Sequence, residues 1–236
     1  NTIDIFNTAT GHPAGARESA VDIYKTGGLT RLDWRIEFVR SATGGSGHID
    51  GWVPTDLSSF TALTVATGTI SSPATANNVI AVASYCSKFQ WQRNDGTVIT
   101  DTACGAGSVG DASNFSNRGP TRDGRQKPDI AAPGQRLAST RSTGQTTLLD
   151  SDNIVAQDLN HKYISGTSMA APVVAGALAR TLERQAASTV ASLRTALQNQ
   201  ARSDAKVSAW GALPNPVFGY GKLRVLGCGE QLSAAP

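Results

Sequence analysis

The chain has 236 residues, of which 39% are hydrophobic and 17% charged, a composition typical of folded globular proteins and not of disordered ones. The net charge of +3 is small for this length, and no run of lysine or arginine forms a track for nucleic acid, so we expect no nucleic-acid partner. No apolar segment approaches the roughly 18 residues of a membrane-spanning helix.

The N-terminal part of the chain is predicted to form short antiparallel strands. Apolar residues alternate with charged ones over residues 32–38, the period of two that a half-buried strand requires. Weaker strand patterns occupy residues 20–24 and 48–53, and glycine-rich turns separate the three. We therefore expect a β-rich module over residues 1–66 and a second part over residues 67–236.

Residues 86–104 have the pattern of a hairpin. Asn-Asp-Gly at residues 94–96 suits a three-residue turn with its glycine in the left-handed conformation. Cys86 and Cys104 are equidistant from the centre of this turn, which places them opposite each other at the base of the hairpin. A cross-strand disulfide is the favoured interpretation, with two separate thiols as the alternative. Cys228 is then left to pair with an upstream segment or to stay free.

Several segments around the middle of the chain have the composition of core and turn elements. A continuous apolar run over residues 79–83 is expected of a parallel strand buried on both faces. Phe-Ser-Asn-Arg-Gly-Pro at residues 115–120 and Lys-Pro-Asp-Ile-Ala-Ala-Pro-Gly at residues 127–134 follow it. Prolines fix the turns there, and we expect Asp129 to accept hydrogen bonds from loop amides without a chemical role. Residues 142–162 are polar and turn-rich, which predicts a surface loop.

Tyr-Ile-Ser-Gly-Thr-Ser-Met-Ala-Ala-Pro at residues 163–172 leads into a run of small and apolar residues. We expect a buried helix from Ser168 to about Gln185, with Pro172 in its first turn, where the missing N–H costs least. Free amides and the positive end of the helix dipole would then stabilise negative charge that develops at Ser168. The alternative is that the serine is only an N-cap. Ala170 excludes a lipase-type Gly-x-Ser-x-Gly elbow.

A second, amphipathic helix is predicted over residues 188–200. Its apolar face is expected to carry Val190, Leu193 and Leu197, and its outward face Arg194 and Gln198.

Three of these segments closely resemble, in the same order, the motifs of subtilisin-like serine proteases, the subtilases. They lie at residues 115–120, 127–134 and 166–172, and Phe-Gly-Tyr-Gly-Lys-Leu at residues 218–223 resembles the closing turn of that family's domain. The resemblance runs from about residue 70 to residue 226. It implies an α/β fold in which this chain is the C-terminal portion of a subtilisin-like parallel sheet, preceded by an antiparallel β-module. Some subtilases carry a β-rich insertion of this kind.

The same resemblance implies a serine endopeptidase that acts on protein or peptide substrates. The role of nucleophile falls on Ser168, whose own backbone N–H helps to hold the oxyanion, and Gly166, Thr167 and Met169 support it. Structural calcium is implied by the family alone, because no Asp or Glu cluster with ligand spacing occurs. We therefore assign no metal site and no other cofactor.

The other members of a Ser-His-Asp triad have no match in the sequence. The family places a His-Gly-Thr motif before its serine, and none of His12, His48 and His161 lies in such a motif. The nearest earlier acid, Asp4, is too close to His12, and Asn7 lacks the Ala-Gly that precedes the family's oxyanion asparagine.

The chain also lacks an initiator methionine and a basic-then-apolar leader. We therefore expect a piece of a longer, secreted or extracytoplasmic protein, whose upstream half supplies the base, its acid and the asparagine. The alternative is a catalytically inactive relative that acts as a binding or scaffold module.

Overall fold

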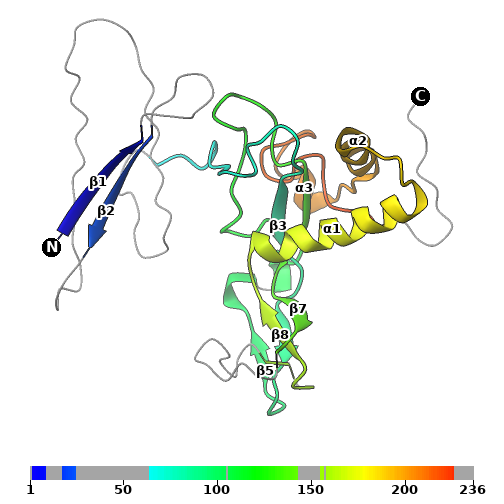
Figure 1. Ribbon diagram of the computed structural model, residues 1–236. Coiled ribbons are helices and arrows are strands. Elements are labelled where there is room, and N and C mark those ends of the chain that lie inside the picture. The colour runs from blue at the N-terminus through cyan, green and yellow to red at the C-terminus, as the bar shows by residue number, and fades with distance from the viewer. Residues whose placement is uncertain are drawn as a thin grey trace, which may run out of the picture. The chain divides into compact units, whose positions relative to one another are not determined.

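A parallel pair of strands lies at the centre of the C-terminal part, so the predicted α/β class is confirmed (Figure 1). β3 (Val82–Cys86) pairs with β6 (Ile130–Gln135), and Val82 lies opposite Ile130. This strand begins later than the predicted run over residues 79–83. The Asp129 carboxylate accepts the N–H of Ala81 at 2.7 Å, which keeps that amide out of the strand ladder.

The computed structural model describes residues 2–8, 18–24, 64–104, 106–142, 155–156 and 158–225. The chain divides into two units, residues 1–51 and 52–236. In the first, β1 (Thr2–Thr8) and β2 (Glu18–Tyr24) pair antiparallel, as expected for the N-terminal module. The strands predicted over residues 32–38 and 48–53 lie outside the described residues.

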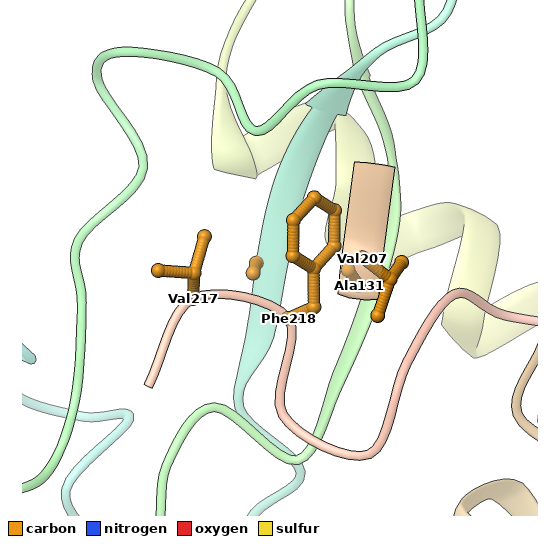
Figure 2. Packing of buried hydrophobic residues seen from close by; sticks show 5 residues of the cluster. Ala131, Val207, Val217 and Phe218 are labelled. Carbon is orange, nitrogen blue, oxygen red and sulfur yellow. The ribbon is translucent and has the colours of Figure 1, made fainter. Parts of the chain in front are cut away.

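The two faces of the β3–β6 pair bury different clusters, as expected for a parallel strand pair. On one face, Ile130 and Ala132 pack against Ala170 and Val174 of α1 (Thr167–Arg184). Successive side chains of a strand point to opposite faces, so Ala131 contributes to the other cluster. There Phe218 packs with Ala131 and with Val207 of α3 (Ala205–Ser208), and Val217 completes the cluster (Figure 2).

The helix α1 has the predicted bounds, but it is not buried on all sides in this part of the chain. Ala170 and Val174 are its buried residues, whereas Ala171, Ala175 and Ala179 of the outer face are exposed among the residues that the structure describes. The predicted buried helix is therefore buried, within the described residues, only on the face that carries Ala170 and Val174. A helix of small residues with one face open to solvent is the result.

The hairpin has the predicted turn. β4 (Gln90–Gln92) and β5 (Val98–Thr100) pair antiparallel, and Gly96 adopts the left-handed conformation with φ 84°. Cys86 and Cys104 form a disulfide with a Cα–Cα distance of 6.0 Å. Cys86 ends β3 and Cys104 lies in the short 3-10 helix η2 (Thr102–Cys104), so the bridge joins the core sheet to the segment after the hairpin.

A second antiparallel pair connects β6 to α1. β7 (Leu137–Thr140) pairs with β8 (His161–Ile164), with Leu137 opposite Ile164. The last residues of the predicted loop over residues 142–162 therefore belong to a strand, and residues 143–154 lie outside the described part. Another short 3-10 helix, η3 (Ala106–Ser108), follows the hairpin.

The second predicted helix forms as α2 (Val190–Gln200), but its predicted polar face was wrong. Thr189 caps it, and Ser192 completes a reciprocal capping box. Val190 is exposed, whereas Arg194 turns inward and lies 3.4 Å from the carboxylate of Asp129. The Asp129 carboxylate is buried, and a buried charge has to be paired, which draws Arg194 from the surface.

Candidate active site

The first turn of α1 presents Ser168 to solvent. Gly166 is the N-cap residue and no side chain caps the helix, so the interpretation of Ser168 as an N-cap is wrong. Ser168 is exposed, one residue inside the helix. The amides of the first turn have no acceptor within the helix, so the N–H groups of Thr167 and Ser168 are available to a ligand.

Pro172 is the sixth residue of α1 and so lies in the second turn and not in the first. In a regular helix the N–H of residue 172 would donate to the carbonyl oxygen of Ser168. Proline has no N–H, so this carbonyl loses its helical donor. The ring therefore costs a hydrogen bond at Ser168 itself, so the expectation that Pro172 lies where the missing N–H costs least was wrong.

The turn before Ser168 is fixed on the core strand β6. The N–H of Gly166 donates to the carbonyl oxygen of Gly134 at 2.8 Å, and Gly166 has a φ of 157°. A Cβ on Gly134 would lie 2.8 Å from the carbonyl oxygen of Gly166 and 3.0 Å from the Cβ of Ala170. Only glycine at residue 134 allows α1 to approach the sheet this closely.

A second contact reaches the same turn from the corner between β6 and β7. The N–H of Arg136 donates to Oγ of Ser165 at 3.0 Å, and its Nε donates to Oδ2 of Asp101 at 2.8 Å. Burial raises the pKa of Asp101, but hydrogen bonds from Arg136 and Gln135 outweigh it and hold that pKa below its usual value. Sequence analysis missed both residues, because 35 positions separate them and neither belongs to a recognised motif.

The structure does not bring His161 to Ser168. His161 begins β8 and Ile164 ends it, so at about 3.4 Å per residue the histidine lies roughly 10 Å down the strand. Its Nδ1 contacts Oδ2 of Asp158 at 2.5 Å, and this hydrogen bond holds the pKa of Asp158 below its usual value. Both side chains are about half exposed, at 45% and 49%.

The other residues considered for a triad do not lie in the unit that carries Ser168, or lie outside the described residues. Asp4 and Asn7 lie in β1, in the other unit of the chain. His12 and His48 lie outside the described residues. Cys228 also lies outside them.

Neither a metal site nor a membrane span is found in the described ranges. No group of three or more His, Cys, Asp and Glu side chains there is arranged to hold a metal ion. No helix in that part of the chain has the length and apolarity that crossing a membrane requires.

A cavity of ≈ 400 Å³ lies near the hairpin, lined by Gln92, Ala156, Asp158 and Tyr163.

The arrangement at α1 suits a nucleophilic hydroxyl. Ser168 offers an exposed Oγ beside free amides and at the positive end of a helix dipole, where an oxyanion is stabilised. A serine hydroxyl also needs a base to remove its proton, and no hydrogen bond joins Ser168 to a histidine within the described residues. Within the described residues, Ser168 therefore has the exposure and the neighbouring amide donors that suit a nucleophile, and no base is bonded to it.

Known proteins that are similar to this chain include serine proteases. The profile of the subtilase family matches residues 1–221. The chain is 33% identical over 133 residues to the serine protease AprX of Bacillus subtilis, covering 56% of this chain and 26% of AprX. It is 47% identical over 64 residues to the serine protease/ABC transporter B family protein tagB of Dictyostelium discoideum, covering 27% of this chain and 3% of tagB.

Among solved structures, the CspB protease of Clostridium perfringens matches with a TM-score of 0.45 and 28% identity. That match covers 67% of this chain and 28% of the protease chain. The chain thus spans well under half the length of AprX, tagB and CspB.

Proposed function

Because this chain belongs to the subtilase family, we propose that the complete protein is a serine endopeptidase and that Ser168 is its nucleophile. The observation that carries the proposal is the exposed Ser168 hydroxyl in the first turn of α1, beside amides that have no helical acceptor. The substrate is a protein or an unfolded peptide.

The chemistry follows from this geometry. A histidine base takes the proton of Ser168 Oγ while the oxygen attacks the scissile carbonyl carbon, and the histidinium gives that proton to the leaving amine as the acyl-enzyme forms. Water then hydrolyses the acyl-enzyme with the same histidine as base, which releases the acid product and the free serine. The carbonyl oxygen becomes an oxyanion in the first step, and the N–H of Ser168 at the start of α1 donates to it. Gly166 and Thr167 place this amide, and Met169 lies against the turn, since its Sδ would be 3.4 Å from a Cβ on Gly166.

We assign the base, its orienting acid and a side-chain oxyanion donor to an upstream half of the same catalytic domain. The exposed outer face of α1 supports this assignment, since Ala171, Ala175 and Ala179 offer a surface of small side chains against which a further element can pack. The upstream half is thus the partner that this chain requires for activity.

The proposal also covers the cellular location of the enzyme and its domain organisation. The Cys86–Cys104 disulfide supports a secreted or extracytoplasmic location, because disulfides persist in oxidising compartments. The antiparallel pairing of β1 and β2 supports an inserted β-module over residues 1–66.

A fluorophosphonate probe tests the assignment of the nucleophile in the complete protein. The probe phosphonylates an activated serine, so peptide mapping is expected to find the adduct on Ser168. Ser168→Ala is expected to abolish labelling and to lower turnover by orders of magnitude with the fold intact. Ser203→Ala, which removes an exposed serine outside α1, serves as the matched control.

Failure to label Ser168, together with equal peptidase activity in the Ser168→Ala variant, would refute the proposal. A protein that folds, binds peptides and cleaves none of them would instead be the inactive relative.

A further inference from the structure

We propose that Asp101 and Arg136 form a positioning pair for the Ser168 nucleophile, by holding the turn before α1 from the side of the hairpin. The inference rests on the proposed function, since it concerns the same site. Neither residue belongs to the segments by which the chain resembles subtilases. Asp101 lies just after the hairpin strand β5, and Arg136 lies at the corner between β6 and β7.

The backbone of Arg136 makes the contact with the turn. Its N–H donates to Oγ of Ser165 at 3.0 Å, and the next residue, Gly166, is bound to Gly134 at 2.8 Å. Arg136 has a φ of 55°, in the left-handed region that a non-glycine residue adopts only at a cost in backbone strain. Such a conformation persists only where the surroundings impose it, so the side chain of Arg136 has to be held.

The side chain is held by a buried carboxylate and by an indole ring. Nε of Arg136 donates to Oδ2 of Asp101 at 2.8 Å, and the guanidinium lies 5.1 Å from the centroid of the Trp91 ring. The side chain of Asp101 is 5% exposed and that of Arg136 is 30% exposed. Hydrogen bonds between charged groups are roughly twice as strong as neutral ones, and burial at Asp101 reduces screening by solvent.

Asp101 is in turn anchored to the core. Its N–H donates to the carbonyl oxygen of Phe89 at 2.7 Å, and its own carbonyl oxygen accepts from Cys104 at 3.2 Å. The Cys104 side chain is joined to Cys86 at the end of β3. A continuous path of bonds therefore runs from the core strand through the disulfide, Asp101 and Arg136 to Ser165.

This path gives the pair an effect on catalysis beyond its effect on stability. Displacement of a reacting group by about 1 Å can cost about 100-fold in rate. Loss of the pair is expected to loosen the contact between Arg136 and Ser165 and to let Ser168 move relative to its base. We therefore expect kcat and the rate of acylation to fall about 10- to 100-fold while KM changes little.

The test uses the complete protease and compares Asp101→Asn, Arg136→Gln and the double variant. Peptide hydrolysis gives kcat and KM, and the fluorophosphonate labelling rate reports the reactivity of Ser168 directly. The double variant is expected to be no slower than either single variant, because both remove one contact. Arg136→Lys keeps a cationic donor and is expected to recover part of the rate.

Asp123→Asn is the matched control, since Asp123 makes an ion pair of 2.7 Å with Arg125 in another loop. It is expected to label at the wild-type rate. Asp101→Asn preserves side-chain size, so it carries the test even if Arg136→Gln fails to fold.

The outcomes separate this inference from the function on which it rests. An unlabelled wild-type Ser168 would overturn the function itself. Labelling of wild-type Ser168, with Asp101→Asn reacting at the same rate and differing only in melting temperature, would overturn the positioning role alone.

Discussion

The carbonyl oxygen of Gly134 accepts a hydrogen bond of 2.8 Å from the N–H of Gly166, and this bond joins the core strand β6 to the turn before Ser168. Because neither glycine has a side chain, the backbones of the strand and the turn come close enough for a direct hydrogen bond. The position of the nucleophile is thereby set by the sheet and not by the helix alone.

Gly134→Ala is expected to destabilise the protein and to abolish labelling of Ser168. The added Cβ would meet Oγ of Ser84 and the carbonyl oxygen of Gly166, so α1 has to move away from β6. Overpacking of this kind costs about 1–3 kcal/mol. Urea unfolding and fluorophosphonate labelling measure the two effects, and wild-type values in both would show that the contact has no importance.

Asp129→Asn is expected to lower the free energy of unfolding by about 3–5 kcal/mol, because it leaves a buried cation without its counter-charge. Lys127 Nζ lies 2.6 Å from Oδ2 of Asp129, and both side chains are 5% exposed. Asp123→Asn removes an exposed carboxylate, 61% accessible, and is expected to cost less than about 1 kcal/mol. Similar denaturation midpoints for the two variants would contradict the special role of burial.

Removal of the Cys86–Cys104 disulfide is expected to cost about 3 kcal/mol, the value for a closed loop of this length. Denaturant unfolding of Cys104→Ser in the Cys86→Ser background measures the loss. Peptide mapping without reductant should recover the linked pair from the wild-type protein. Recovery of both cysteines as free thiols would contradict the disulfide.

The stability of the protein is expected to depend on the ionisation of Asp101. Its pKa lies below the 3.8 of a free aspartate, so in acid the unfolded chain binds a proton before the folded chain does. The stabilisation is complete above about pH 5 and is lost as the pH falls through the folded-state pKa. The difference in melting temperature between the wild type and Asp101→Asn should therefore shrink in acid. A difference that stays constant with pH would contradict the stabilising role of ionised Asp101.

Residues 1–236 alone are expected to show no casein hydrolysis, because the triad acts as a unit and we assign its base to an upstream half. Addition of the upstream half in trans should restore cleavage. Gly176→Leu provides a structural test, since a Cβ at this exposed position of α1 meets no atom within 4 Å. The substitution should raise the stability of the isolated chain by up to about 1 kcal/mol and weaken the complementation.

Complementation at wild-type affinity by the Gly176→Leu chain would show that the outer face of α1 stays uncovered. Robust cleavage by residues 1–236 alone would place the base within this chain.

Local patterns were sufficient to predict the elements of the site, but not the contacts that hold them. The turn around Gly96 and the bounds of α1 follow from short-range rules of backbone geometry. The inward turn of Arg194 depends on Asp129, which is far away in the sequence and whose burial no local pattern reveals. The pairing of Asp101 with Arg136 escapes prediction for the same reason.

The register of helix α1 shows the limit of local inference at the site itself. Ser168 was expected to start the helix, whereas the first residue is Thr167 and Gly166 is the N-cap. Glycine at residue 166 can cap a helix without a side chain, which no serine-based rule anticipates.

The indole of Trp91 has an optical consequence. It is 5% exposed and its ring centroid lies 5.3 Å from that of Tyr163, at an interplanar angle of 37°. Two aromatic chromophores fixed at this separation couple electronically and produce a near-ultraviolet circular dichroism band. Because Trp91 lies on the hairpin and Tyr163 on the strand that leads to Ser168, the band is a spectroscopic signal of hairpin docking, readable without substrate.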